Sequence, residues 1–429
     1  MILIRNAQVV TTTGVEKADI LIQDDRFVKI APQLTRPVDA EMVEAEGLVA
    51  LPGLVDIHVH LREPGGEHKE DFYSGTCAAL AGGVTTVLGM PNTTPPITDE
   101  ASLEAALHLA AQKAVCDFGL YLGATRDNIA TAARVRRAVG LKMYMGSSTG
   151  ALLVNSLEDQ YAHLAAYPRE RVVAVHAENE EAVQYFAARG QRRPPLCAAL
   201  ETARATLMAQ SLRRSIHICH LSTAQEIQMV REAKQRGEPV TCEVTPHHLF
   251  LSSEIEPHLG ALGRTNPPLR ATSDAAALWD NLKSVDAIAS DHAPHTLQEK
   301  QGDAPPSGVP GLETMLPLLL TAVQQKLLSL TDMVRLTATS PARLFGLEGK
   351  GCIAADYDAD LVLVDPEAQR TISGKDLLTR CGWTPFEGWR ARGRVVQVYV
   401  RGQLAFAEGR VLAPPGTGRQ VRQMARQLT

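Results

Sequence analysis

The central part of the chain alternates short apolar runs with longer segments in which apolar residues recur at helical spacing. Eight such runs, each short enough for one β-strand, cover residues 54–60, 84–90, 116–123, 139–145, 171–177, 215–221, 239–245 and 285–291. Amphipathic helices are expected between them, for example over 102–114 and 223–237. Eight consecutive β–α units predict an α/β fold, a (β/α)8 barrel of the TIM type, whose chemistry lies where the strands end.

Both ends of the chain carry a different pattern. Residues 1–50 and 346–429 contain short stretches of alternating apolar and polar residues, which are typical of β-strands. Two separate β appendages would fit this pattern, but strands on both sides of a central α/β block favour one shared domain. We therefore expect a barrel over residues 51–345 and a small β-sandwich domain built from residues 1–50 and 346–429. The segment from residue 414 onward is either a weakly ordered arm or a packed terminal helix.

Composition excludes several classes of function. The 429 residues are 45% hydrophobic and 21% charged, which is ordinary for a globular protein. The formal net charge of -5 provides no basic surface, so no nucleic-acid partner is expected. Apolar runs such as 316–323 are too short to cross a membrane, and MILIRNAQVV at the start lacks a signal-peptide core. Seven cysteines without a CxxC pair favour reduced thiols and a cytoplasmic location.

Two histidines end the first apolar run. His58 and His60 are two residues apart, so on a strand they share a face and can bind one divalent metal ion. Alone, such a pair is more often part of a polar surface. Other runs also end in polar residues, namely Lys142, His176, His220 and Asp291. Because barrel strands end at one rim, these six residues predict a metallohydrolase, in which two metal ions ~3.5–4 Å apart can act together.

Lys142 does not fit a simple metal site, because an ammonium group repels a cation. One interpretation is a solvated surface lysine. The segment LKMYM around it is apolar, however, and burying a lysine is costly unless its charge is removed. A neutral lysine can add carbon dioxide to form a carbamate, an anion able to bridge two metal ions. Charge arguments alone leave both interpretations open.

Several longer motifs resemble those of dihydroorotases, which belong to the amidohydrolase superfamily. The motifs are HVHLREPG, AGGVTTVLGMPNTTPP, GLKMYM, ICHLST, EVTPHHLFLS, SDHAPH and GVPGLETMLPLLL. The similarity runs from about residue 51 to 339 and resumes at WTPFEG, and it is greatest to the dihydroorotase domain of the animal multienzyme pyrimidine-synthesis protein. The full set of motifs is highly specific, although single motifs are not.

The resemblance implies a cyclic amide hydrolase with two zinc ions. The implied ligands are His58, His60, Lys142, His176, His220 and Asp291. The first two histidines would bind one zinc ion, the other two histidines the second, and a carboxylated lysine would bridge them. The aspartate would be a ligand and the proton shuttle. Common stand-alone bacterial dihydroorotases carry a DDG-like segment and lack the bridging lysine, so GLKMYM places this chain with the lysine-bridged type.

The resemblance also implies a substrate pocket. Its residues would be Arg62, Asn92, Asn266, His295, Pro310 and Gly311. A forked guanidinium such as Arg62 can bind a substrate carboxylate through two hydrogen bonds. The backbone around the last two residues would close the pocket, in a segment (298–311) rich in glycine and proline. Residues 147–149 are approximate counterparts of a loop that covers the substrate.

The implied reaction is the reversible cyclisation of N-carbamoyl-L-aspartate to L-dihydroorotate in de novo pyrimidine biosynthesis. A homodimer is also implied, with association with an aspartate transcarbamoylase as a further option. Two alternatives stay open: a hydantoinase- or allantoinase-like cyclic amidase, and a catalytically inactive scaffold for the transcarbamoylase. Arg62 argues against the first because it suits a carboxylated ring, and the complete set of ligands argues against the second.

Other polar residues near the strand ends receive weaker roles. His247 and His248 are adjacent, so on a strand they would face opposite ways, and metal binding is not expected. His292 is expected to hold its loop by hydrogen bonds. Cys219 and Glu243 end neighbouring strands and could form an accessory metal site. On a regular strand, however, Cys219 faces away from the histidine that follows it, so a packing role is expected instead.

Overall fold

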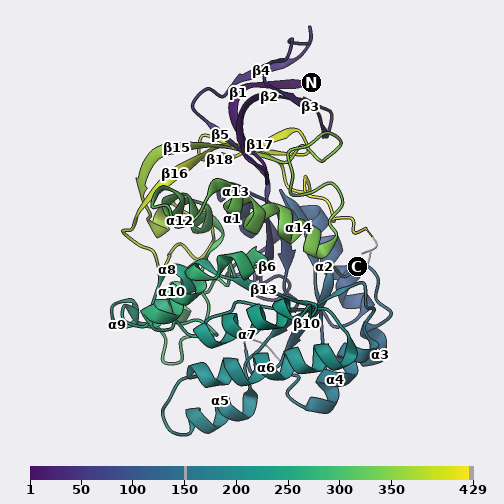
Figure 1. The fold of residues 1–429 in the computed structure, drawn as a ribbon, viewed down its shortest axis with the longest axis vertical. Helices are drawn as coiled ribbons and strands as arrows, with labels where there is room; N and C mark the ends of the chain where they lie inside the picture. The colour runs from purple at the N-terminus through teal and green to yellow at the C-terminus, as the bar shows by residue number, and fades with distance from the viewer. Residues whose placement is uncertain (149–151, 425–429) are drawn as a thin grey trace.

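The computed structural model describes residues 1–148 and 152–424, which form a barrel and an adjoining sheet domain (Figure 1). The barrel strands are β6 (Leu54–Val59), β7 (Val84–Gly89), β8 (Asp117–Leu120), β9 (Leu122–Gly123), β10 (Gly140–Tyr144), β11 (Val172–His176), β12 (Ile216–Ile218), β13 (Val240–Val244) and β14 (Ala287–Ile288). Strands β8 and β9 follow each other with one residue between them, so each of the eight predicted runs contains a strand. The prediction of a (β/α)8 barrel is confirmed.

Parallel pairing runs around the whole barrel. Hydrogen bonds link β6, β7 and β8 in one sheet and β9 to β14 in another. The circle closes where the backbone N–H of His60 donates to the carbonyl of His292 at 2.8 Å. Nearly all strand residues are buried, which explains why these strands appear in the sequence as continuous apolar runs.

Helices cover the outside of the barrel (Figure 1). They are α1 (Phe72–Ala81), α2 (Glu100–Lys113), α3 (Ile129–Ala132), α4 (Leu157–Ala166), α5 (Glu180–Ala187), α6 (Pro195–Leu212), α7 (Ala224–Gln235), α8 (Pro246–Phe250), α9 (Glu256–Leu259), α10 (Thr272–Asp280), α11 (Leu297–Lys300), α12 (Leu312–Gln324), α13 (Leu330–Val334) and α14 (Ser340–Phe345). The two helices predicted by periodicity are present as α2 and α7. Each begins at a capping box, formed by Asp99 with Ser102 and by Thr223 with Glu226.

The two ends of the chain share one sheet domain, as expected. Its strands are β1 (Ile2–Val10), β2 (Val15–Gln23), β3 (Arg26–Ala31), β4 (Glu41–Glu44), β5 (Val49–Pro52), β15 (Leu361–Thr371), β16 (Arg390–Val400), β17 (Gln403–Ala407) and β18 (Arg410–Val411). All nine strands are hydrogen-bonded into one sheet, in which β5 pairs antiparallel with β15. A separate apolar core, with Ile20, Phe27 and Leu361 among its members, stabilises this domain.

A buried cation joins the base of the barrel to the sheet domain. The ammonium of Lys350 lies 2.5 Å from Asp117, 2.9 Å from Asp358 and 2.7 Å from Asp360. The described end of the chain packs beside this cluster, because the N–H of Val421 donates to the carbonyl of Phe118. Residues 414–424 are therefore packed but not helical, and residues 425–429 lie outside the described part. Within the described ranges, no helix is long and apolar enough to cross a membrane.

Candidate metal centre

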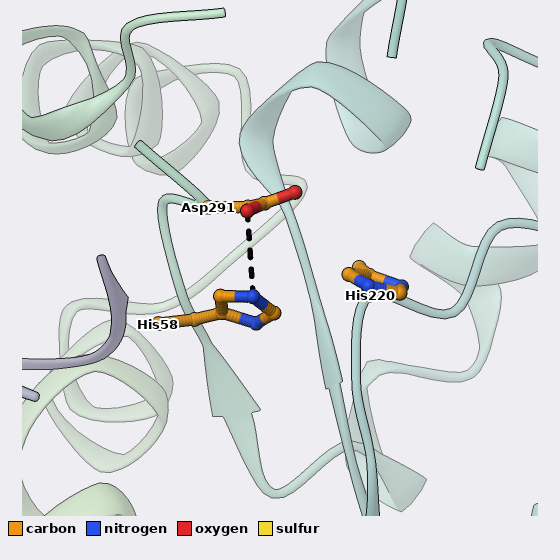
Figure 2. Close-up of side chains that lie close together, drawn as sticks. All are labelled: His58, His220 and Asp291. Carbon is orange, nitrogen blue, oxygen red and sulfur yellow. Dashed lines mark ion pairs between the residues drawn. The ribbon is translucent and has the colours of Figure 1, made fainter. Parts of the chain in front are cut away.

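The predicted metal ligands meet in one cavity at the carboxyl ends of the barrel strands. His58 lies in β6 and His60 just after it, His176 ends β11, His220 follows β12, and Asp291 follows β14. All five line one cavity. The four histidines are at most 7% exposed. Figure 2 shows His58 and His220 pointing toward Asp291 from different elements.

The distances among these side chains suit a shared metal site. Nε2 of His60 lies 3.1 Å and Nε2 of His58 lies 3.4 Å from Oδ1 of Asp291. Nδ1 of His176 lies 3.0 Å from Nε2 of His220. One ligand atom each from His58, His220 and Asp291 lies within 4.8 Å of the others. Imidazole nitrogen and carboxylate oxygen are the ligands that zinc and related divalent metals take in proteins.

Electrostatics favour the metal-binding forms of His60, His220 and Asp291, whereas the carboxylates around His58 favour a positive charge there. Burial lowers the pKa of His60 to about 4, and burial together with the positive field of His176 and Lys142 lowers the pKa of His220 well below 6.5. Burial opposes ionisation of Asp291, but His58 and His60 outweigh it and hold its pKa well below 3.8. Burial and Lys142 also act to lower the pKa of His58, but Glu243 and Asp291 raise it to about 10. The carboxylates of Glu243 and Asp291 therefore favour a positive charge beside them, and a bound metal ion would provide this charge.

Lys142 is fully buried beside the histidines, so the interpretation as a solvated surface lysine is wrong. It lies on β10, whose residue Tyr144 pairs with His176 of β11. Its Nζ is 2.9 Å from Sγ of Cys219, and it makes no ion pair with a carboxylate in residues 1–148 and 152–424. An unpaired buried ammonium is costly, and a carbamate on this nitrogen would replace the positive charge by a negative one.

Cys219 packs in a buried apolar cluster, as expected, but it does not face away from its neighbour. Strand β12 ends at Ile218, and His220 has a φ of 37°, which breaks the alternation of side chains on which the expectation rested. Sγ of Cys219 therefore reaches the barrel interior next to Glu243 and His58, and ligand atoms of these three residues lie within 4.8 Å of one another. Glu243 also contacts Nδ1 of His58, which orients that imidazole toward Asp291.

The predicted carboxylate-binding residues lie together beside the metal ligands. Arg62 is 7% exposed, its Nε donates to the carbonyl of Pro294 at 3.0 Å, and its Nη2 lies 3.1 Å from Nε2 of His295. Arg62 has a φ of 64°, so the backbone is not extended there, yet its side chain enters the cavity. Oδ1 of Asn92 lies 2.6 Å from Nδ1 of His60. Burial lowers the pKa of Arg62 to about 10 against the opposing effect of Asp291, Glu299 and Glu70, and none of these carboxylates within the described residues lies at ion-pair distance from the guanidinium.

Of the remaining predicted residues, Asn266 lines the cavity, whereas Pro310 and Gly311 lie just behind its wall. Ser307, Gly308 and Val309, which directly precede these two residues, line it as well. The N–H of Gly311 donates to Nδ1 of His292 at 3.2 Å, so His292 holds this segment as expected. Ser148 also lines the cavity, whereas residue 149 of the predicted loop lies outside the described part.

Several cavity residues were not predicted, among them Tyr144, His247, Thr265 and Ala293. Tyr144 lines the cavity two residues after Lys142, and His247 lines it after β13. The expectation that His247 and His248 face opposite ways on a strand is wrong, because both lie in helix α8 with ring centroids 4.5 Å apart. The signal in the sequence was Thr-Pro directly before the two histidines, which is typical of a helix start.

Comparisons with known proteins agree with this site. A model of the amidohydrolase family matches residues 49–405, and the chain belongs to that family. It is 40% identical over 445 residues to a dihydroorotase of Methanosarcina mazei, covering 97% of this chain and 96% of the relative. It is 38% identical to a dihydroorotase of Pyrococcus furiosus, covering 92% and 90%. The chain is also 42% identical to the multifunctional protein CAD of Squalus acanthias, of whose length the match spans only 17%.

Solved structures of related enzymes share the fold. An L-hydantoinase (dihydropyrimidinase) from Arthrobacter aurescens superposes with a TM-score of 0.94 at 27% identity, over 98% of this chain and 99% of that one. A dihydropyrimidinase from Brevibacillus agri gives a TM-score of 0.93 at 30% identity, over the full length of both chains. Family and fold together make this protein an amidohydrolase-family enzyme whose side chains include groups able to hold metal ions.

Proposed function

We propose that the chain is a dihydroorotase, which interconverts N-carbamoyl-L-aspartate and L-dihydroorotate in de novo pyrimidine biosynthesis. The observation that carries the proposal is Arg62, a buried guanidinium at the metal centre. Asp291, Glu299 and Glu70 act on it from a distance, but no carboxylate of the described residues lies within ion-pair distance of it. Dihydroorotate differs from hydantoin and dihydrouracil in its ring carboxylate, and a guanidinium is the group best suited to bind one. The similarity to archaeal dihydroorotases over nearly the full chain supports the same substrate.

The proposed cofactor is a pair of zinc ions. The proposed ligands are His58 and His60 for one ion, His176 and His220 for the other, Asp291, and Lys142 as the bridge. The side chains present fit such ions. Nδ1 of His220 is buried with no hydrogen-bond partner in the described part of the chain, and buried polar atoms are rarely left unpaired. When bound, two such metal ions activate a water molecule and polarise the amide carbonyl.

The carboxylated state of Lys142 is part of the proposal. An uncharged Nζ forms an N–C bond with carbon dioxide and loses one proton, which leaves an anionic carbamate. Burial disfavours both charged forms of this side chain, and two bound cations would favour the anionic carbamate over an ammonium beside four histidines. Cys219 and Glu243, which share His58 as a neighbour, are proposed as an accessory metal site next to the pair.

Asp291 is the proposed acid–base residue. Its low pKa keeps it ionised, so it can accept the proton of the attacking water and return it to the leaving ring nitrogen. Arg62, Asn92 and His295 are proposed to bind the substrate carboxylate. Asn266 and the backbone around Pro310 and Gly311 are proposed to close the pocket from the opposite side. Cyclisation uses the same groups in reverse order.

The experiment that tests the proposal is a comparison of substrates. The zinc-loaded protein is given dihydroorotate, dihydrouracil and hydantoin under the same conditions. We expect kcat/KM for dihydroorotate to exceed the others by at least ~10²-fold, because only this substrate forms the charged pair with Arg62. The solved hydantoinases with the same fold favour the second candidate, a hydantoinase-like amidase. Equal or better turnover of the uncharged rings would select that candidate.

Association and location are proposed as well. We expect a homodimer, and we expect co-purification with an aspartate transcarbamoylase when both are produced together. Sedimentation of the purified protein at several concentrations tests the first expectation. A cytoplasmic location is proposed because none of the seven cysteines is disulfide-bonded. An inactive scaffold is disfavoured, since the side chains of all six proposed ligands are present.

A further inference from the structure

Three buried polar side-chain atoms of cavity-lining residues have no hydrogen-bond partner among the residues that the structure describes. They are Oη of Tyr144, Nδ1 of His220 and Nε2 of His247. Metal binding accounts for His220, and Tyr144 lies with its ring 5.2 Å from Nζ of Lys142, among the proposed ligands. His247 has no role in the proposed mechanism. A buried nitrogen without a partner costs roughly 1–3 kcal/mol, so its position calls for a partner that residues 1–148 and 152–424 do not supply.

The local structure holds His247 rigidly in this position. Thr245 caps helix α8 by accepting from the N–H of His248, and Pro246 occupies the first turn. The neighbouring His248 is satisfied, with Nδ1 2.8 Å from Oγ1 of Thr245 and Nε2 3.2 Å from the carbonyl of Pro267. The adjacent imidazoles therefore differ: His248 anchors the helix start, whereas His247 is 2% exposed and lines the cavity.

The order of strands around the barrel places His247 relative to the other groups. Strand β13, which leads into His247, pairs with β14, which leads into Asp291. The segment after β14 lies beside β6, which leads into Arg62. Asp291 is therefore flanked by Arg62 on one side and His247 on the other. A substrate whose carboxylate meets Arg62 and whose leaving nitrogen meets Asp291 extends its next atoms toward His247.

The charge state of His247 suits a neutral partner. Burial lowers the pKa of His247 to about 4, and it forms no ion pair with a carboxylate in the described part of the chain. A neutral imidazole offers one N–H donor and one acceptor. In dihydroorotate, the atom bonded to the leaving nitrogen on the far side from the scissile bond is the ureide carbon. Its carbonyl oxygen is an uncharged acceptor.

We propose that His247 is a substrate-binding residue whose ring N–H donates a hydrogen bond to the ureide carbonyl of the cyclic substrate and of its carbamoyl product. The proposal rests on the proposed function for the orientation of the substrate. Two residues on opposite sides of Asp291 would then bind different parts of the substrate. Arg62 binds the carboxylate, and His247 binds the ureide that dihydroorotate shares with dihydrouracil and hydantoin.

Variants at position 247 test the proposal. His247→Leu removes the hydrogen bond and should lower kcat/KM at least ~10-fold, the effect of losing roughly 1.4 kcal/mol, toward dihydroorotate and dihydrouracil alike. His247→Gln keeps an N–H donor and should recover part of this loss. Zinc content should stay unchanged in both variants. Arg62→Gln is the matched control, because it should affect dihydroorotate far more than dihydrouracil.

Inhibition by two ligands separates substrate binding from a structural role. Succinate carries carboxylates but no ureide, so its inhibition constant should be unchanged in His247→Leu and raised in Arg62→Gln. The affinity for carbamoyl-aspartate should fall in both variants. Equal weakening of succinate and carbamoyl-aspartate in His247→Leu, loss of zinc, or full activity would overturn the proposal. A lower kcat at unchanged KM with a shifted pH profile would show that His247 acts on Asp291 and would also overturn it.

The same assays distinguish a failure of the His247 proposal from a failure of the proposed function. If the protein hydrolyses dihydrouracil but not dihydroorotate, the function proposed above fails, and the ureide contact is still measurable with dihydrouracil. If dihydroorotate is the preferred substrate and His247→Leu has no effect on it, only the His247 proposal fails.

Discussion

Replacing Arg62 by glutamine removes the charged group that distinguishes a dihydroorotase from other cyclic amidases. Arg62 is held by two uncharged neighbours, the carbonyl of Pro294 at 3.0 Å and Nε2 of His295 at 3.1 Å. These contacts fix the direction of the guanidinium without neutralising it. The counter-ion is expected to arrive with the substrate.

The expected magnitude follows from the chemistry of the lost contact. A hydrogen bond to a charged group contributes ~1.5–3 kcal/mol, and a bidentate guanidinium–carboxylate pair can exceed this. Because ~1.4 kcal/mol corresponds to a tenfold change, the variant should lose at least ~10²-fold in kcat/KM on dihydroorotate. Burial lowers the pKa of Arg62 to about 10, which marks a desolvation cost, so its replacement should not lower the stability of the fold.

The assay follows the absorbance of dihydroorotate and, in parallel, the hydrolysis of dihydrouracil, with zinc content measured in each sample. Dihydrouracil has no carboxylate, so its hydrolysis should fall far less. Arg62→Lys keeps the positive charge but loses the two parallel N–H donors of the guanidinium. Its kcat/KM on dihydroorotate should therefore lie between the values of the wild type and Arg62→Gln. Equal losses on both substrates would refute the reasoning and would make Arg62 a structural residue.

Three further perturbations probe other parts of the molecule. Lys142→Ala should lose bound metal and activity, and a short carboxylic acid should restore part of both. Native mass spectrometry of the wild-type protein should show one added carbon dioxide. A Lys142→Ala variant that keeps two metal ions and normal turnover would exclude the bridging role. Asp291→Asn should reduce kcat by ~10²–10⁴-fold or more, since general acid–base groups contribute this much; activity within tenfold of wild type would place the base elsewhere. Burial raises the pKa of Glu313 to about 7, so the folded state favours the protonated form and loses stability as pH rises from 4.5 through 7. The free energy of unfolding in urea, measured at pH 5 and pH 8, should fall by up to ~3 kcal/mol in the wild type and should stay constant in Glu313→Gln. An equal change with pH in both proteins would contradict this prediction.

The barrel and its proposed metal ligands could be predicted from the sequence because both follow from patterns of neighbouring residues. Parallel barrel strands are buried on both faces, so each appears as an apolar run, and the groups that do chemistry follow directly where a run ends. His58, Lys142 and His176 are found by this rule alone. The pairing of the two chain ends in one sheet could also be expected, because β5 and β15 both carry the strand pattern.

Other features depend on backbone angles and contacts that no local pattern reveals. The position of Cys219 depends on the φ of 37° at His220, which turns both side chains inward where a regular strand would separate them. His247 enters the cavity because α8 begins directly after β13, so the periodicity changes at Thr245. The lining by Ser307, Gly308 and Val309 depends on how the segment before α12 packs against His292, which is a contact between distant parts of the chain.

Metal titration of the stripped protein tests the central claim most directly. The chain is freed of metal with a chelator, mixed with bicarbonate as a source of carbon dioxide, and titrated with zinc while the hydrolysis of dihydroorotate is followed. We expect no activity without metal and a rise in activity that reaches its plateau when the two proposed sites are filled. Hydrolysis of dihydrouracil should stay far slower at every zinc concentration. A fully zinc-loaded, folded protein that leaves dihydroorotate unchanged in both directions of the reaction would contradict it.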